Sequence, residues 1–222
     1  MRMHRKSRLD ERLVACKTVL TVADLTDKNM KTAAMQRQEL NSLQIFKNAN
    51  PIHLEIGCGK GKFVCEKAVR YPDINFFAVE KISNVLIEAA ERAVKENLKN
   101  VHFLNCAAEV LPRYIKAGSV EVIYLNFSNP LPKLGYAKQR LTHPRFLQEY
   151  RQLLSGNGKI IQKTDDEDFY RFSLDSYINS GYTVVEKCED VAALSDPENI
   201  VTEHEKRFME MGKKIYKIVA KP

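Results

Sequence analysis

The chain has 222 residues, of which 44% are hydrophobic and 28% are charged. This is the composition of a globular protein with a sizeable core, and it excludes collagenous and disordered chains. No apolar run approaches the ~20 residues that span a membrane, and no apolar signal-peptide region follows the basic start MRMHRK. We therefore expect a cytoplasmic protein without a membrane segment.

The net charge is +7, and the positive excess is unevenly distributed. Residues 1–50 hold 10 Lys and Arg against 5 Asp and Glu, and residues 128–151 hold 5 against 1. Clustered positive charge attracts polyanions, because neutralised phosphates release condensed counterions. On charge alone, a nucleic-acid partner and plain solubility remain equally open.

The five cysteines include no CxxC pair, and no histidine stands near them at metal-ligand spacing. Their odd number argues against a complete set of disulfides. We expect free thiols in a reducing compartment and no metal site.

From Pro51 onward, short apolar runs alternate with segments of helical spacing. Strands are expected at 52–57, 74–80, 101–106, 120–127, 159–165, 182–187 and 214–220. Helices are expected at 62–71, at 84–97 behind Ser83 as N-cap, at 111–115, at 144–154 before the terminating Gly156 and Gly158, and at 169–179. This alternation predicts an α/β fold with a doubly wound, Rossmann-like parallel sheet and helices on both faces.

The first 50 residues do not follow this rhythm. They are basic and polar, with weak helical spacing around residues 30–43. The sequence therefore predicts a basic N-terminal arm with accessory helices at 1–50, and an α/β domain at 51–222.

A glycine-rich loop follows the first expected strand of the domain. The segment EIGCGKG (55–61) places Gly57, Gly59 and Gly61 at alternate positions before a helix. Glycines let the backbone turn tightly and let a ligand approach where a Cβ would obstruct it. The spacing differs from the dinucleotide fingerprint GxGxxG, and the loop lacks the Lys-Ser/Thr pair of a P-loop.

Two acids flank this loop and favour a particular ligand. Glu55 at the loop start can hold a cationic ammonium, and Glu80 at the end of the second strand can accept both ribose hydroxyls. These acids suit S-adenosylmethionine, which carries an amino acid and a sulfonium but no phosphate. Asn105 and Ala107 stand at the end of the third strand, where the adenine edge would lie.

The fourth strand ends in NFSNPLPK (126–133), in which two prolines fix a rigid turn. In a doubly wound sheet this turn stands at the carboxyl end of the strands, and we expect it to overlie the glycine loop. Basic residues that suit phosphate contacts follow it, namely Lys133, Lys138, Arg140 and Arg145.

Together these segments resemble a known family, the bacterial tRNA (guanine-N7-)-methyltransferases. The matching stretches are MRMHRK, HLEIGCGKGKF, LNFSNPLPK, KQRLTHPRFL, KTDDEDFYRFSL and TEHEKRFMEMGKKIY, in the family's order over nearly the whole chain. The resemblance implies a class I methyltransferase domain and S-adenosylmethionine as methyl donor. It also implies tRNA as partner and N7 of guanine 46 in the variable loop as the methylated atom.

The resemblance also implies roles for single residues. The cofactor would be held by Glu55, Gly57, Gly59, Gly61, Glu80, Asn105, Ala107 and Asn129. The substrate would be bound by Lys133, Asp165, Thr202, Glu203, His204 and Glu205. Asn129 stands where the family has its central aspartate, Ala107 where it usually has an acid, and Leu131 where it has a tryptophan.

We expect Asn129 to be the catalytic residue, acting by positioning the guanine. Candidate contacts to tRNA phosphates are Arg2, Arg5, Lys6, Arg8, Lys138 and Arg140. Two alternatives remain: a methyltransferase acting on a small molecule, and a catalytically impaired homologue that binds tRNA. The sequence leaves open whether the protein is a monomer or a homodimer.

Overall fold

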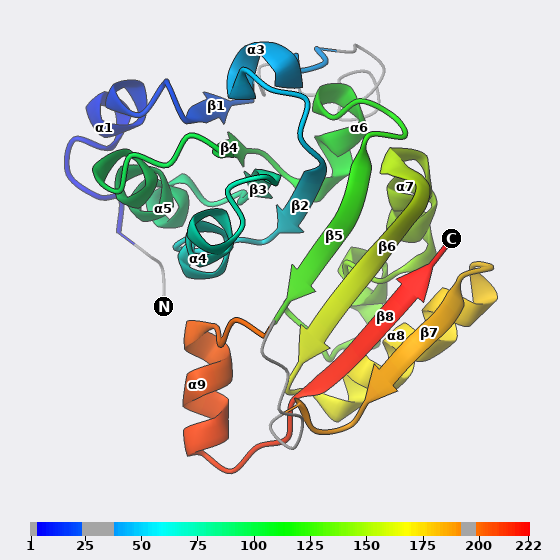
Figure 1. The fold of residues 1–222 in the computed structure, drawn as a ribbon. Coiled ribbons are helices and arrows are strands. Elements are labelled where there is room, and N and C mark those ends of the chain that lie inside the picture. Colours follow the sequence, from blue (N-terminus) through cyan, green and yellow to red (C-terminus); the bar gives the residue numbers. More distant parts are fainter. Residues whose placement is uncertain (1–3, 24–37, 192–198) are drawn as a thin grey trace. The chain divides into compact units, whose positions relative to one another are not determined.

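The computed structural model describes residues 4–23, 38–191 and 199–222 (Figure 1). Its contacts divide the chain into two compact units, 1–114 and 115–222. In the described residues, each unit contributes four strands, with helices packed beside them.

The strands of the first unit are all parallel. They are β1 (Leu20–Val22), β2 (Ile52–Ile56), β3 (Asn75–Val79) and β4 (Val101–Asn105), in the spatial order β1-β4-β3-β2. Every residue of β3 and β4 is buried. Continuous burial explains why both strands are nearly uninterrupted apolar runs, as is usual in a parallel sheet covered by helices.

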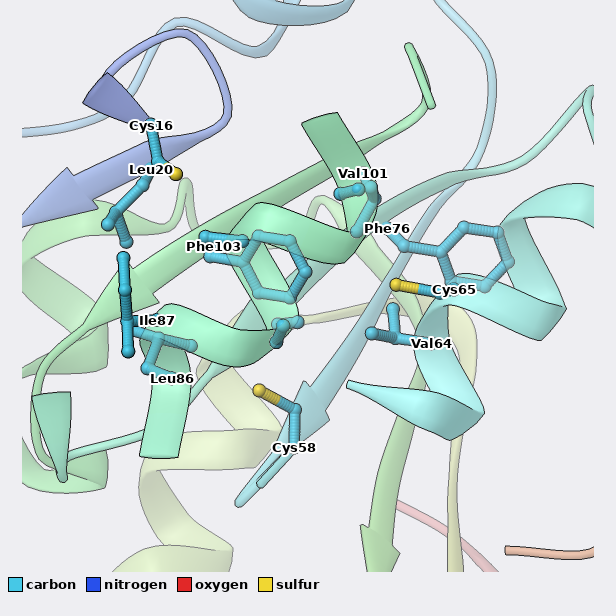
Figure 2. Close-up of a cluster of buried hydrophobic side chains, with 14 of the residues drawn as sticks. Cys16, Leu20, Cys58, Val64, Cys65, Phe76, Leu86, Ile87, Val101 and Phe103 are labelled. Carbon is cyan, nitrogen blue, oxygen red and sulfur yellow. The ribbon is translucent and has the colours of Figure 1, made fainter. Parts of the chain in front are cut away.

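The helices of this unit are short except for two. They are α1 (Leu9–Ala15), α3 (Ser42–Phe46), α4 (Lys62–Arg70), α5 (Ser83–Lys95), the 3₁₀ turn η1 (Ala108–Val110) and α6 (Leu111–Tyr114). Helices α4 and α5 pack against each other and against β4, and α1 packs on α5. Figure 2 shows the resulting core, in which Val64, Leu86 and Phe103 are fully buried.

Two expectations for this unit need correction. Strand β1 was not foreseen, although Leu20, Thr21 and Val22 pair with β4. Ser83 does not cap α5, because it is the first helical residue and its hydroxyl donates to Asn105 Oδ1 at 2.7 Å. The expected helix at 30–43 lies mostly outside the described residues, and the domain boundary at residue 50 stays a prediction.

The strands of the second unit form a mixed arrangement. They are β5 (Val120–Asn126), β6 (Leu154–Thr164), β7 (Thr183–Cys188) and β8 (Tyr216–Lys221), in the order β5-β6-β8-β7. Strands β5 and β6 are parallel, whereas β8 runs antiparallel to both β6 and β7. The last strand is thus inserted between two others, a departure from the fully parallel sheet expected from the sequence.

The helices of this unit are η2 (Leu134–Gln139), α7 (Pro144–Leu153), α8 (Glu167–Asn179) and α9 (Glu203–Glu210). Helix α7 does not end at Gly156 and Gly158, because β6 begins directly at Leu154 and contains both glycines. Helix α9 was not expected at all. Its start is fixed by a capping box, a local signal that the sequence carries as T-x-x-E.

All five cysteines are free thiols, as their odd number and spacing predicted, and four of them are buried. Within the described ranges, no helix has the length and apolar character needed to cross a membrane. The same part of the chain contains no group of three or more potential metal ligands.

Candidate cofactor and substrate sites

The loop between β2 and α4 is built on left-handed glycines. Gly57, Gly59 and Gly61 have φ angles of 82°, 56° and 74°. A Cβ on Gly61 would lie 2.5 Å from the Cβ of Ala89 on α5, so only glycine allows this close approach of the loop to the helix. The loop therefore packs closely on α5 at Gly61. By contrast, a Cβ at Gly57 or Gly59 would meet no atom within 4 Å.

The two acids predicted to flank the loop both act electrostatically on the Cys58 thiol. Glu55 is only 3% exposed, while Glu80, directly after β3, is half-buried. Burial raises the pKa of Cys58 well above its usual value, and the negative charges of Glu55 and Glu80 raise it further. Both carboxylates are thus close enough to act on one thiol, which concentrates negative charge at the glycine loop.

Backbone and side-chain contacts fix the position of Glu80. Its Oε1 accepts a hydrogen bond from Ile82 N at 2.9 Å, and its own N–H donates to Leu104 O at 3.2 Å. Asn105 Nδ2 donates to the carbonyl of Glu80 at 2.8 Å, while Asn105 Oδ1 accepts from Ser83. Asn105 therefore joins the ends of β3 and β4 to the start of α5, a supporting role beyond the adenine contact expected from the sequence.

Ala107 precedes η1 and brings no polar side-chain atom to the site. The sequence had already indicated this missing acid. The polar and loop groups that the first unit offers a cofactor at the predicted positions are consequently two carboxylates, three glycines and one amide.

The N-terminal segment is bound along α5. Lys6 N donates to Asn84 Oδ1 at 3.0 Å, and Asn84 Nδ2 donates to His4 O at 2.9 Å. Lys6 Nζ forms a salt bridge with Glu88, and Lys60 Nζ of the glycine loop lies 3.3 Å from the same carboxylate. One acid of α5 therefore joins the N-terminal segment to the candidate cofactor loop.

Three further basic residues of the arm are also paired with acids. Salt bridges join Arg5 to Asp10, Arg8 to Glu11 and Arg12 to Glu91. Arg2 lies outside the described residues. The expected phosphate contacts of Arg5, Lys6 and Arg8 would require their ion pairs to exchange partners. The pairs of Arg5 and Arg8 are exposed and exchange at little cost, whereas that of Lys6 is partly buried.

In the second unit, the turn after β5 has a constrained backbone. Phe127 and Leu131 have φ angles of 50° and 47°, unusual values for residues that carry a Cβ. Asn129 Oδ1 accepts from Leu131 N at 3.1 Å, and Arg140 Nη2 donates to Leu131 O at 3.2 Å. Asn129 thus holds its own turn, and its side chain is exposed.

The basic residues after this turn differ in their surroundings. Lys133 and Lys138 are exposed. The guanidinium of Arg140 lies 4.3 Å from the ring centre of Phe172, in addition to its contact with the turn. Lys138 suits an expected phosphate contact, whereas Arg140 positions the turn.

Asp165 directly follows β6, whose neighbour β5 leads to Asn129. The last paired residues of these parallel strands are Asn126 and Lys163, so both site residues follow the same end of the strand pair. Asp165 Oδ2 forms a 2.8 Å salt bridge with Lys213 Nζ. The exposed fraction of the Asp165 side chain is 18%, which leaves its carboxylate partly accessible.

The segment 202–205 begins α9. Thr202 Oγ1 accepts from Glu205 N at 3.0 Å, and Glu205 Oε2 accepts from Thr202 N at 3.4 Å. Glu205 also pairs with Lys163, whose Nζ lies 3.1 Å from Oε2, and accepts from Asn199 Nδ2 at 2.8 Å. In this structure Thr202 and Glu205 therefore hold α9 against β6, His204 is exposed, and the Glu203 side chain lies outside the described residues.

Several residues at these sites were not found by sequence reasoning. They are Phe127, Lys163, Asn199, Phe208 and Lys213. The sequence signals for Lys163 and Lys213 were weak, because a single lysine near a strand end or after a helix is common. The expected approach of the proline turn to the glycine loop involves both units and stays a prediction.

A glycine loop flanked by acids, directly after a buried strand (β2) of a parallel unit covered by helices, is typical of α/β methyltransferases of the Rossmann-like type. A solved S-adenosylmethionine-dependent methyltransferase from Aquifex aeolicus has a similar fold, with a TM-score of 0.56 and 14% identity over 80% of this chain and 86% of that one. Residues 49–218 match the family described as putative methyltransferases.

Curated relatives narrow the family. The tRNA (guanine-N(7)-)-methyltransferase of Oceanobacillus iheyensis is 39% identical over 180 residues, which are 81% of this chain and 84% of the relative. The protein of the same name from Alkaliphilus oremlandii is 40% identical over 79% of this chain and 83% of the relative. The chain belongs to this methyltransferase family.

Proposed function

We propose that the protein transfers a methyl group from S-adenosylmethionine to N7 of guanine 46 in the variable loop of tRNA. The observation that carries the proposal is the glycine loop with Glu55 and Glu80 beside it, in a chain of this family. The alternating strands and helices of both units provide the framework that the family's chemistry requires.

The residues of the first unit fit the methyl donor. Glu55 would bind the ammonium group and Glu80 the ribose hydroxyls, because carboxylates accept hydrogen bonds from both. Gly57 and Gly59 leave open space above the loop, where a side chain would obstruct a ligand. When bound, the cofactor supplies an electrophilic methyl group on a sulfonium.

The chemistry places modest demands on the protein's own residues. Guanine N7 carries an in-plane lone pair and no proton, so no general base is required. A bond forms between N7 and the methyl carbon while the carbon–sulfur bond breaks, and the positive charge moves from sulfur to the guanine. The task of Asn129 and Asp165 is then to orient the base and exclude water, which is catalysis by proximity.

The tRNA must expose its guanine before this reaction. The N7 edge of a base held in tertiary structure is not freely accessible, so local opening at a cost of a few kcal/mol is expected. Phosphates would be contacted by the arm and by Lys138. Removing residues 1–8 should raise the KM for tRNA and flatten its salt dependence, with little change in cofactor affinity.

The five free cysteines fit a reducing compartment, which supports a cytoplasmic location. The alternative of a non-catalytic tRNA-binding homologue is favoured by Asn129 and Ala107, which replace acids. Titration with S-adenosylmethionine separates the two, because a protein that binds tRNA without catalysis has no need for the cofactor.

The deciding experiment incubates the protein with unmodified tRNA and labelled S-adenosylmethionine, followed by nucleoside analysis. We expect 7-methylguanine, and its loss when position 46 of the tRNA carries adenine. Methylation of another base, or none at all, would refute the proposal. A parallel incubation with an extract of small molecules tests the alternative of a small-molecule methyltransferase, which would transfer the label to a component of the extract.

A further inference from the structure

Three aromatic side chains gather beside the turn that carries Asn129. The ring centroids of Phe127 and His204 are 6.0 Å apart, those of Phe127 and Phe208 are 5.9 Å apart, and those of His204 and Phe208 are 6.1 Å apart. The planes of these rings differ by only 25° to 37°. We call these three residues the aromatic patch.

The geometry of the patch leaves aromatic surface available. Three centroids separated by nearly equal distances form a triangle, so no ring is sandwiched between the other two. His204 is exposed, and Phe127 and Phe208 are only half-buried. A cluster that served packing alone would bury its rings, as the fully buried Phe146 and Tyr150 do elsewhere in this unit.

Contacts with Lys163 fix the two chain segments that carry the aromatic patch. Phe127 N donates to Lys163 O at 2.8 Å, and the side chain of Lys163 is paired with Glu205 of α9. The strand end that carries Phe127 and the helix that carries His204 and Phe208 are therefore joined through one lysine. A stacking surface gains affinity when its rings are fixed before the ligand arrives.

The surroundings of the patch suit a guanine. Lys213 Nζ lies 4.7 Å from the ring centre of Phe208 and forms the salt bridge with Asp165, so Asp165 is a neighbour of the patch. A carboxylate accepts hydrogen bonds from N1–H and N2–H of guanine, whereas its repulsion disfavours bases that present acceptors there. An aromatic surface beside such an acceptor is the arrangement by which enzymes hold an extruded base.

We propose that the target guanine stacks on the aromatic patch of Phe127, His204 and Phe208, with Asp165 at its Watson–Crick edge. The proposal deepens the function given above and rests on it. The patch is sequence-tolerant by itself, because every base has a π face, and Asp165 supplies the preference for guanine.

The test replaces rings while keeping apolar volume. Phe127→Leu and Phe208→Leu should each lower kcat/KM for tRNA about 5- to 150-fold, the loss that ~1–3 kcal/mol of stacking per base represents. Phe127→Tyr and Phe208→Tyr should retain activity, because the ring remains. Tyr71→Leu is the matched control, since Tyr71 is a half-buried aromatic residue of α4's end, outside the patch.

A second measurement locates the base directly. Transfer RNA with photoreactive 6-thioguanosine at the methylated position is irradiated with the wild-type protein and S-adenosylhomocysteine, and the cross-linked peptides are identified. We expect cross-links to residues 127, 204 or 208. Cross-links only elsewhere, or leucine variants as active as the wild type, would overturn the proposal while wild-type methylation continued. If the wild type forms no 7-methylguanine, the proposed function itself fails.

Discussion

Lys163 Nζ and Glu205 Oε2 lie 3.1 Å apart, with side chains only 7% and 1% exposed. A buried charge that loses its partner is strongly destabilising. We expect Glu205→Leu to lower the free energy of unfolding by about 3–5 kcal/mol, measured by urea denaturation. The double variant Lys163→Met/Glu205→Leu should recover most of this loss, because it leaves no charge unpaired.

Glu210→Ala serves as control for this pair, since Glu210 is an exposed residue at the end of the same helix. A Glu205→Leu variant as stable as Glu210→Ala would contradict a structural role for the pair. Because Glu205 was also assigned to substrate binding, tRNA affinity should be measured on the stable double variant.

Gly61 differs from Gly59 in the space around it. Alanine at either position pays for a left-handed backbone, about 1 kcal/mol, but only alanine at 61 would collide with Ala89, at 2.5 Å. Gly61→Ala should therefore be less stable than Gly59→Ala by about 1–3 kcal/mol. Thermal unfolding measures this difference, and equal losses in the two variants would show that the contact with α5 relaxes freely.

Gly59→Ala is expected to act on the ligand instead. Its added methyl group points into open space above the loop, where the cofactor would approach. Calorimetric titration should show weaker binding of S-adenosylmethionine by Gly59→Ala, at a stability only about 1 kcal/mol below that of the wild type.

The sequence predicted the strands and helices that depend on local burial. Strands β3 and β4 are continuously buried and mostly apolar, and a run of this kind can be recognised from the sequence alone. Strand β1 was missed because its apolar run, residues 19–23, is short and lies in the first 50 residues, which were interpreted as an arm, while its partner is the distant β4. A strand that short is specified by tertiary pairing, which no local pattern records.

The candidate sites were predicted unevenly for a similar reason. Glu55 and Glu80 were found because the glycine loop marks the carboxyl end of a strand, a relationship fixed by the fold. The pairing of Lys163 with Glu205 links residues 42 positions apart, and nothing near Lys163 distinguishes it from a surface lysine. T-x-x-E was recognised through the family resemblance, although the capping box is its direct physical meaning.

His102 makes the stability of the protein dependent on pH. Burial lowers its pKa from 6.5 to about 4, and its Nε2 lies 2.8 Å from Thr21 Oγ1. The unfolded chain binds the His102 proton more readily than the folded protein does, so protonation favours unfolding. The stability that depends on neutral His102 is therefore fully present above pH 6.5 and is lost as the pH falls to about 4. The loss is on the order of 3 kcal/mol.

Urea denaturation at several pH values checks this expectation. His102→Leu should flatten the fall in stability between pH 6.5 and 4, whereas the control His4→Ala, at an exposed histidine, should leave it unchanged. An unaltered pH dependence in His102→Leu would assign the acid sensitivity to other groups.

Glu88 neutralises two lysines that would otherwise be available to phosphate. Lys6 and Lys60 both pair with it, and these contacts lower the pKa of the Glu88 carboxyl, with the Lys6 hydrogen bond as the main cause. Glu88→Gln should strengthen tRNA binding and steepen its salt dependence, by about one unit of slope for each new phosphate contact. Lys6→Ala should act in the opposite direction, and filter binding at several salt concentrations distinguishes the two.

The turn after β5 keeps its side-chain hydrogen bond only if residue 129 carries an oxygen acceptor. Asn129 Oδ1 accepts from Leu131 N, and an aspartate could accept the same bond. Asn129→Asp should therefore retain or raise kcat, since the added charge also favours the cationic product. Asn129→Ala should lower kcat about 10- to 100-fold, because the turn and the guanine lose their alignment. Asn157→Ala, at an exposed position of β6, is the control, and full activity of Asn129→Ala would remove Asn129 from the mechanism.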